Sequence, residues 1–216
     1  MQKILAIFDF CETLVSIQSI QPYLDMVGKA NPYYNKQTLH WQRKILPRLH
    51  RYTKLSVFDF NPPRYPELKG FDIEHATQIA KDYVQQNLIH KTNAKVLDRL
   101  RFHQESGHTI AIVSGGLEIY IKEFAKLFNI DNIIAISLQS HDGILNGNID
   151  GIHTMEYRKL YKLTQMLDTN AFDLKNSYAY SDCPSDIPLL SFVGNGVAIE
   201  CGKDLQWAHI MGYEIL

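Results

Sequence analysis

The sequence has few cysteines and no long apolar run, and each absence excludes a class of protein. Its three cysteines, Cys11, Cys183 and Cys201, include no close pair. Such a set is unlike a disulfide scaffold or a cysteine zinc site, and it indicates a reducing compartment. No apolar run reaches the ~20 residues of a membrane-spanning helix, and the N-terminus lacks the features of a signal peptide. We therefore expect a cytoplasmic protein with no membrane partner.

An excess of charge is also absent from the chain as a whole. The formal net charge is −1, whereas nucleic-acid-binding domains are usually strongly basic, so we expect no nucleic-acid partner. One stretch differs, because residues 26–58 contain lysine and arginine but no aspartate or glutamate. This basic segment is either a solvated helix face or a positive lid that attracts an anionic substrate. The sequence gives no indication of oligomeric state.

Short apolar runs alternate with helical patterns along most of the chain. Residues 4–8 and 109–113 are typical of buried strands in a parallel sheet. Helices are expected at residues 117–128 and about 154–167, and a hairpin around residues 142–148. Further strands are expected at residues 132–138, 177–180, 197–199 and 213–216. This alternation predicts an α/β fold with a doubly wound, Rossmann-like parallel sheet.

A long interval separates the first two predicted strands. Residues 16–84 have the pattern of helix and loop, and a structureless loop of that length is implausible inside a compact domain. We therefore predict a small helical cap domain at residues 16–84, inserted into an α/β core formed by residues 1–15 and 85–216. Such an insertion can cover the carboxyl edge of the sheet, where open α/β sheets bind ligands.

Four groups of polar residues follow predicted strands or lie on a predicted helix. They are residues 9–14 (DFCETL), residues 114–116 (SGG, expected to open a helix), Lys159, and residues 181–186 (SDCPSD). Because the carboxyl ends of parallel strands meet at one edge, we expect the four groups to converge. They supply a carboxylate nucleophile, a hydroxyl and amides for phosphate oxygens, a cation, and carboxylates for a hard metal ion. Phosphoryl transfer requires this set.

In order and position, these groups resemble the motifs of the haloacid dehalogenase (HAD) superfamily. The resemblance is to its phosphoserine-phosphatase-like branch, subclass IB, which has a helical cap after the first motif. It covers nearly the whole chain and includes residues 178–190 (YAYSDCPSDIPLL), 197–199 and 212–213. It implies a phosphoric monoester hydrolase that requires Mg²⁺ and acts on a small-molecule phosphate ester.

The resemblance also implies a nucleophile and a metal site. Asp9 would attack phosphorus and form an aspartyl-phosphate, while Thr13 would support the first loop. Mg²⁺ would be bound by Asp9, the backbone carbonyl of Cys11 and Asp182. Asp186 would hold a water of the metal or orient the catalytic lysine.

The phosphate-binding residues follow from the same resemblance. Ser114 and the amide of Gly115 would bind the transferring oxygens, assisted by the positive end of the following helix. Lys159 matches the catalytic lysine of the family better than its neighbours Arg158 and Lys162. The alternative is that all three basic residues only cover a helix surface.

The chain departs from the family two residues after the nucleophile. Family phosphatases have an aspartate there, which protonates the leaving oxygen and then activates water, but this chain has Cys11. A thiol with an ordinary pKa of about 8.5 is neutral at pH 7 and is a weak donor and a poor base. The chain is then a slow phosphatase, a phosphatase for substrates with a good leaving group or their own acid, or a phosphate-binding homologue without hydrolysis. A phosphotransferase or another HAD-type hydrolase using Asp9 is a further alternative, and we favour a phosphatase.

Replacements for the missing base are few. Glu12 is expected to point away from the phosphate, because neighbouring side chains on an extended segment alternate. The other candidates are three histidines of the predicted cap: His40, His50 and His75.

Substrate specificity depends on a second departure. Phosphoserine phosphatases carry a glutamate nine residues after the nucleophile, which pairs with the ammonium of the substrate, but here the residue is Gln18. A neutral amide compensates the desolvation of an ammonium less well than a carboxylate does. We therefore predict that free phosphoserine is a poor substrate. We favour a small polar phosphomonoester without that free amine, such as a sugar or amino-alcohol derivative.

Overall fold

A seven-stranded sheet forms the centre of the molecule. The computed structural model describes residues 2–35 and 63–216, so most of the basic segment, with His40 and His50, lies outside the described residues. The strand order is β4-β3-β2-β1-β5-β6-β7, and every neighbouring pair is parallel except the β3–β4 hairpin. The strands are β1 (Leu5–Phe8), β2 (Thr109–Leu117), β3 (Asn132–His141), β4 (Ile144–Asp150), β5 (Tyr178–Ser181), β6 (Asn195–Ala198) and β7 (Glu214–Ile215). The doubly wound α/β fold predicted from the sequence is confirmed.

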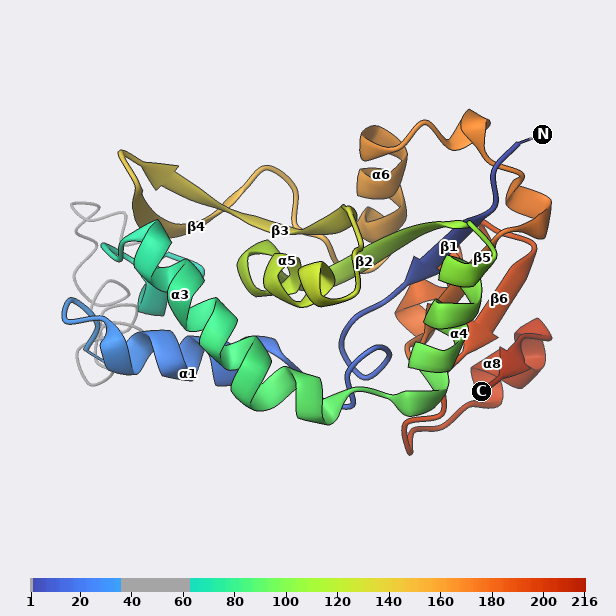
Figure 1. Cartoon of the computed structure of the whole chain (residues 1–216), viewed down its shortest axis with the longest axis horizontal. Helices are drawn as coiled ribbons and strands as arrows, with labels where there is room; N and C mark the ends of the chain where they lie inside the picture. Colours follow the sequence, from blue (N-terminus) through green and yellow to red (C-terminus); the bar gives the residue numbers. More distant parts are fainter. Residues whose placement is uncertain (1, 36–62) are drawn as a thin grey trace, which may run out of the picture.

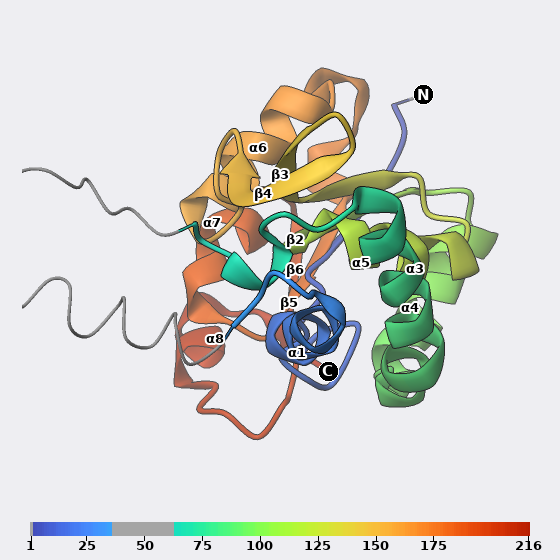
Figure 2. The same ribbon diagram turned by 90° about the vertical axis from the view of Figure 1, so that its left-hand side faces the viewer.

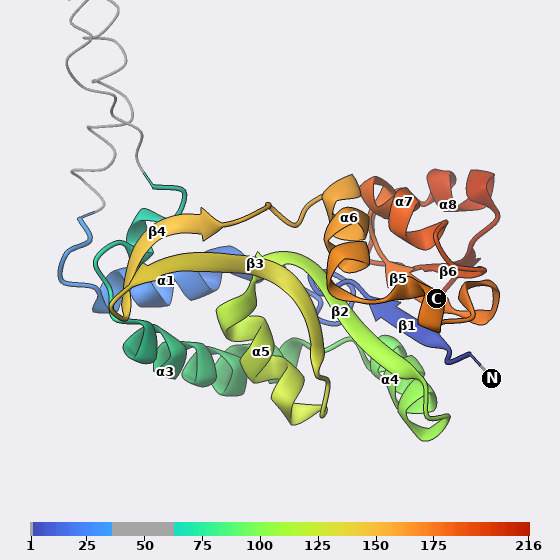
Figure 3. The ribbon, with the colours of Figure 1, turned by 90° about the horizontal axis from the view of Figure 1, so that it is seen from above.

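Helices cover both faces of this sheet (Figure 3). They are α4 (Ala94–Glu105) and α5 (Glu118–Leu127) on one side, and α6 (Tyr157–Met166), α7 (Ile187–Leu190) and α8 (Gln206–Met211) on the other. Successive side chains of β1 alternate between two hydrophobic clusters. Ala6 and Phe8 belong to the cluster that contains α4 and α5, and Leu5 and Ile7 to the cluster beside α6 and α7. The apolar run of β1 is therefore buried on both sides, as expected for a central parallel strand.

Two helices of the predicted insertion lie side by side (Figure 1). They are α1 (Ile20–Ala30) and α3 (Ile73–Tyr83), and a short 3₁₀ turn, η1 (Pro66–Leu68), precedes α3. Asp72 caps α3, because its side chain accepts a hydrogen bond from the backbone amide of His75 at 2.8 Å. Three buried tyrosines join these helices to α5, with ring centroids 5.2–5.9 Å apart: Tyr23, Tyr83 and Tyr120.

The insertion and the sheet share backbone hydrogen bonds. The amide of Leu145 in β4 donates to Phe71 at 2.9 Å, and the amide of Gly70 donates to Leu145 at 2.8 Å. At its other end α3 continues without a break into a π-helical turn, η2 (Val84–Leu88), so the predicted boundary at residue 84 falls inside a helical run. The division into residues 16–84 and a two-part core stays a prediction.

The predicted hairpin differs in detail from the structure. The hairpin turn lies at Asp142 and Gly143, both with positive φ, but residues 146–148 lie within β4 instead of forming a second turn. Gly147 has a φ of 80°, which favours glycine, and its α-carbon lies close to the Tyr65 carbonyl. In residues 2–35 and 63–216, no helix is long and apolar enough to cross a bilayer.

Candidate active site

The ends of three neighbouring strands meet beside Asp9, which directly follows β1. The amide of Asp9 donates to the carbonyl of Tyr180 in β5 at 2.9 Å. The register pairs Phe8 with Ile112 of β2 and with Tyr180 of β5. Two residues further along each strand lie Ser114 and Asp182, so the structure brings these predicted site residues to the same edge as Asp9.

A lysine lies between two carboxylates at this edge, and we call the three residues the buried bridge. Lys159 Nζ lies 2.8 Å from Asp9 Oδ1 and 2.6 Å from Asp186 Oδ2. The exposed fractions of the side chains are 8% for Lys159, 7% for Asp9 and 1% for Asp186. Ser181 Oγ donates to the same Asp186 oxygen at 2.6 Å. Asp186 Oδ1 is buried without a hydrogen-bond partner among the described residues, so it can accept from a further ligand.

Three neighbouring basic residues of α6 make different contacts. Lys159 enters the buried bridge, whereas the guanidinium of Arg158 lies 5.0 Å from the ring centroid of Tyr157. Lys162 Nζ donates to the carbonyl of Ala135 and to Thr154 Oγ1. Among the three, Lys159 is the one whose ammonium contacts Asp9.

Burial and charge compete within the buried bridge. Burial raises the pKa of Asp9 to about 7, even though the Lys159 ammonium beside it lowers that pKa. Burial by itself lowers the pKa of Lys159, but the carboxylates of Asp9 and Asp186 more than offset this and raise it above its usual range. Lys159 is therefore a fixed positive charge at neutral pH.

A second lysine joins two other carboxylates, and we call these three residues the exposed bridge. Lys203 Nζ lies 2.7 Å from Asp182 Oδ2 and 2.6 Å from Glu12 Oε2. The Asp182 side chain is 4% exposed but that of Lys203 is 45% exposed. Thr13 Oγ1 donates to Asp182 Oδ1 at 3.3 Å, so both oxygens of this carboxylate are held. Sequence reasoning missed Lys203, although its place in the loop after the predicted strand at residues 197–199 is a usable signal.

Glu12 does not follow the extended geometry expected for it. Its φ of 56° places it in a tight turn, in which the amide of Val15 donates to the carbonyl of Phe10 at 3.0 Å. The alternation argument was wrong, because it assumed an extended segment. The Glu12 carboxylate contacts Lys203 and accepts a hydrogen bond from Gln18 Nε2.

The group at residues 114–116 lies within a strand and does not open a helix. β2 continues to Leu117 with a shift of register after Val113, and α5 begins only at Glu118. This expectation was wrong, because a β-bulge absorbs the three residues. Ser114 is buried, and its Oγ accepts from the amide of Gly116 at 3.0 Å.

The glycine in this bulge has a steric reason. A β-carbon at Gly115 would lie 2.9 Å from Met155 Cγ and 3.2 Å from the carbonyl of Thr154. Glycine therefore permits the close approach of the loop that precedes α6.

Cys11 lies in a buried hydrogen-bonded chain. Its Sγ is 3.0 Å from Ser19 Oγ, which is 2.7 Å from the hydroxyl of Tyr120. Burial raises the pKa of Cys11 to about 11, and the nearby charge of Asp9 adds to the increase. The thiol is therefore neutral at pH 7 and unsuited to activate water. His75, the cap histidine within the described residues, stacks on Phe71 beside α3.

The charges and donor atoms of the site fit a hard divalent cation. The two bridges contain four carboxylates and two ammonium groups, which leaves two negative charges. Carboxylate and carbonyl oxygens are the ligands that Mg²⁺ prefers, and it usually retains several waters. In the described ranges no three histidine, cysteine or acidic side chains form a metal cluster by themselves. Two carboxylates, one carbonyl and waters do not require such a cluster.

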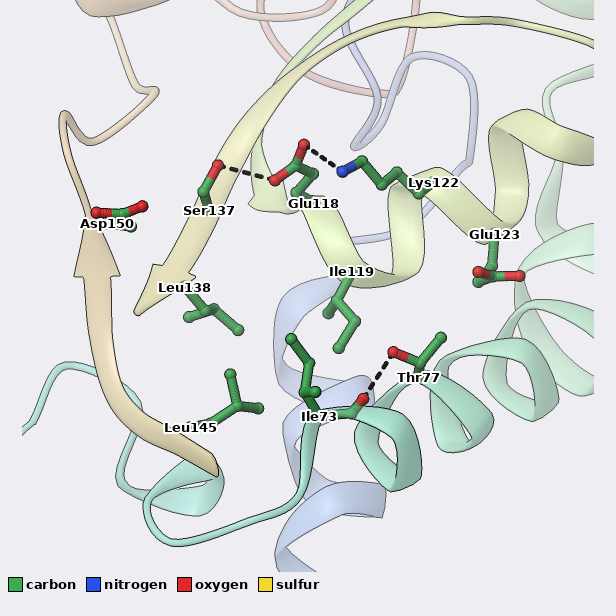
Figure 4. Close-up of a pocket in the computed structure, with 10 residues that line it drawn as sticks. All are labelled: Ile73, Thr77, Glu118, Ile119, Lys122, Glu123, Ser137, Leu138, Leu145 and Asp150. Carbon is green, nitrogen blue, oxygen red and sulfur yellow. Dashed lines mark hydrogen bonds and ion pairs between the residues drawn. The ribbon is translucent and has the colours of Figure 1, made fainter. Parts of the chain in front are cut away.

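Two cavities lie near the insertion. One of about 250 Å³ reaches Gly115 and is lined by α1, the segment around η1 and the loop before α6, with Ile20, Leu24, Arg64, Glu67, His153 and Met155 among its residues. The other, of about 430 Å³, lies between α3, α5 and the β3–β4 hairpin (Figure 4). Its Glu118 is paired with Lys122 and Ser137. No residue of either bridge lines either cavity, but Gly115 lines the smaller one. The smaller cavity is therefore the one connected to the predicted phosphate-binding residues.

Comparison with known proteins supports the fold and identifies the family. A histidinol-phosphatase of Neisseria meningitidis serogroup C is 26% identical over 208 residues, which cover 94% of this chain and 93% of that protein. A protein with unknown function from Bordetella pertussis Tohama I has a similar structure, with a TM-score of 0.78, 20% identity and coverage of 100% and 99% of the two chains. A structure of a phospho-aspartyl intermediate analogue of phosphoserine phosphatase has a TM-score of 0.59 at 20% identity, covering 100% and 93%. The family model described as haloacid dehalogenase-like hydrolase matches residues 6–191, and the chain therefore belongs to that family.

Proposed function

We propose that this HAD-family phosphatase hydrolyses a phosphomonoester of a small polar metabolite through an aspartyl-phosphate on Asp9. The observation that carries the proposal is the buried bridge at the strand ends. There the Lys159 ammonium lies 2.8 Å from Asp9 and 2.6 Å from Asp186. With a pKa of about 7, Asp9 is ionised in a substantial fraction of molecules at neutral pH, and the ionised carboxylate beside this fixed positive charge is the form that attacks phosphorus.

The proposed reaction has two displacements at phosphorus. In the first, a carboxylate oxygen of Asp9 bonds to phosphorus, the ester P–O bond breaks, and the leaving oxygen takes a proton from solvent water to depart as the alcohol. In the second, water attacks phosphorus and gives a proton to solvent, the bond to Asp9 breaks, and inorganic phosphate leaves. Lys159 neutralises part of the charge in both steps, and Ser114 and the Gly115 amide are proposed to bind phosphate oxygens.

The proposed cation site consists of Asp9, the carbonyl of Cys11 and Asp182, with Asp186 nearby. Mg²⁺ bound there would supply charge neutralisation for the phosphoryl group. Asp186 Oδ1, buried and without a described partner, is suited to accept a hydrogen bond from a water of that ion.

Cys11 makes proton transfer the weak point of this site. Its thiol is partly buried, hydrogen-bonded to Ser19 and neutral at pH 7, so it supplies neither a strong acid nor a base. We therefore propose that breakdown of the aspartyl-phosphate limits turnover. A homologue that binds phosphate without hydrolysing it is the second candidate function, and this same thiol is the observation that favours it.

The smaller cavity is proposed to accept the leaving group. Its apolar side chains from α1 and its polar Arg64, Glu67 and His153 fit a small polar molecule. Gln18 donates to Glu12 and does not line this cavity, so its predicted role in substrate binding gains no support. The relative named histidinol-phosphatase makes amino-alcohol phosphates the first compounds to test, with sugar phosphates next.

Phosphate release over a panel of amino-alcohol, sugar and nucleotide phosphates and phosphoserine tests the proposal. With Mg²⁺, we expect release from the first two classes above phosphoserine, and loss of release with a chelator or in Asp9→Asn. Asp98→Asn, which changes an exposed aspartate on α4, is the matched control and should retain activity. Release that survives Asp9→Asn contradicts the covalent mechanism, and phosphate binding without release in the wild type favours the second candidate.

A further inference from the structure

Lys203 and Glu12 of the exposed bridge have no role in the mechanism above, yet Lys203 contacts Asp182, a proposed metal ligand. Lys203 Nζ joins Asp182 to Glu12, residues that are far apart in the sequence. Glu12 is held in turn by Gln18, and Asp182 by Thr13. The ammonium therefore has a defined position beside Asp182, although its side chain is partly exposed.

Lys203 and a cation on Asp182 would share one carboxylate. Since both contact the same group, they are necessarily close, and like charges at such separations repel each other. Glu12 also contacts Lys203, and its negative charge would attract a cation bound to Asp182. The two side chains therefore act on a bound cation in opposite directions.

We infer that Lys203 and Glu12 form a charge-compensating pair that sets the Mg²⁺ affinity of the Asp182 site. In this inference, which rests on the proposed cation site, Lys203 is a positioning residue that weakens cation binding and Glu12 strengthens it. Together they leave the two bridges with two negative charges, which one divalent cation neutralises. A site without Lys203 would have three.

A purely structural role for Lys203 predicts the opposite change in cation affinity when the lysine is removed. If the ammonium only held Asp182 in place, its removal would disorder that carboxylate and weaken cation binding. Lys203→Met thus separates the two roles, because charge compensation predicts tighter binding and simple anchoring predicts weaker binding.

The experiment measures free Mn²⁺ by electron paramagnetic resonance during titration of the full chain, with Mg²⁺ as competitor at constant ionic strength. We expect Lys203→Met to tighten Mg²⁺ binding roughly tenfold, an order of magnitude set by one charge near a partly exposed site. Glu12→Gln should weaken binding several-fold, and the double variant should return close to the wild type. Lys203→Arg keeps the charge and is the matched control, expected to bind like the wild type.

Binding that is weaker or unchanged in Lys203→Met overturns the inference, provided that thermal unfolding shows a folded variant. If that variant is unfolded, Glu12→Gln decides alone, and unchanged or tighter binding there overturns it. A wild type that binds no Mn²⁺ or Mg²⁺ refutes the cation site of the proposed function itself, and with it this inference. The three results are distinguishable because the second and third do not depend on the lysine variant.

Discussion

The two bridges have the same pattern of charges, but their lysine side chains differ in exposure to solvent. In each, one lysine ammonium contacts two carboxylates at 2.6–2.8 Å. Lys159 is 8% exposed, whereas Lys203 is 45% exposed. A buried charge has lost its hydration and depends on its partners, whereas water replaces much of the interaction at an exposed one. We therefore expect the contact to support both stability and catalysis in the first bridge and to be adjustable in the second.

Removing the lysine from each bridge should show the largest difference in stability between the two bridges. Lys159→Met leaves two carboxylates buried without their cation, and we expect a loss of about 3–5 kcal/mol in the free energy of unfolding. Lys203→Met, the matched variant, should lose less than about 1 kcal/mol. Urea unfolding at neutral pH without added metal, followed by circular dichroism, measures both values. Equal losses would show that burial does not distinguish the bridges.

An aspartate at position 11 should show whether the site lacks a general acid/base. Cys11→Asp places a carboxyl group where the thiol contacts Ser19, and we expect phosphate release to increase about 10²-fold, at the lower end of the effect of a general acid/base. The matched control is Cys11→Ser, which removes the thiol without adding a titratable group.

Two other results of that substitution are informative. An unchanged rate in Cys11→Asp would mean that proton transfer comes from elsewhere and that the neutral thiol is not the limit. A similar increase in Cys11→Ser would assign the effect to the removal of sulfur and not to the added acid.

A buried histidine extends the comparison to a titratable group without a carboxylate partner. His103 lies beside His108, with Nδ1 atoms 2.8 Å apart, and its Nε2 is 2.8 Å from the Tyr180 hydroxyl. Burial, together with the charges of His108 and Arg99, lowers the pKa of His103 from 6.5 to about 4.

This lowered pKa predicts a loss of stability in mild acid. The unfolded chain takes up a proton below about pH 6.5 but the folded chain does not, so stability is complete above that pH and falls toward pH 4. Between pH 7 and pH 5 we expect a loss of about 2 kcal/mol from this group, measured by urea unfolding. In His103→Gln that portion of the pH dependence should disappear; an identical pH dependence in the variant would show that other groups cause it.

Local patterns in the sequence were sufficient to predict the sheet and where β1 ends. The apolar run of β1 and the polar residues that follow it predicted a central strand ending at Asp9. The parallel arrangement then placed Ser114 and Asp182 beside it, because strand ends in such a sheet share an edge. These features depend on periodicity and topology, which are visible in a single sequence.

Loop conformation was not predictable in the same way. The positive φ of Glu12 and the bulge after Val113 depend on neighbours that sequence spacing does not identify. Lys203 contacts Glu12 across 191 positions of the chain, so no local pattern connects the two. The exposed bridge was therefore found only in the structure, whereas the position of Asp9 at the end of a central strand was predicted from the sequence.

The most direct test of the central claim is acid-quench mass spectrometry of the enzyme during turnover with Mg²⁺. The substrate is the phosphomonoester that gives the fastest phosphate release in the panel. We expect one added phosphoryl group on the peptide that contains Asp9, present in the wild type and in Asp98→Asn but absent from Asp9→Asn. A phosphoryl group on a different residue, or normal turnover by Asp9→Asn, would contradict it.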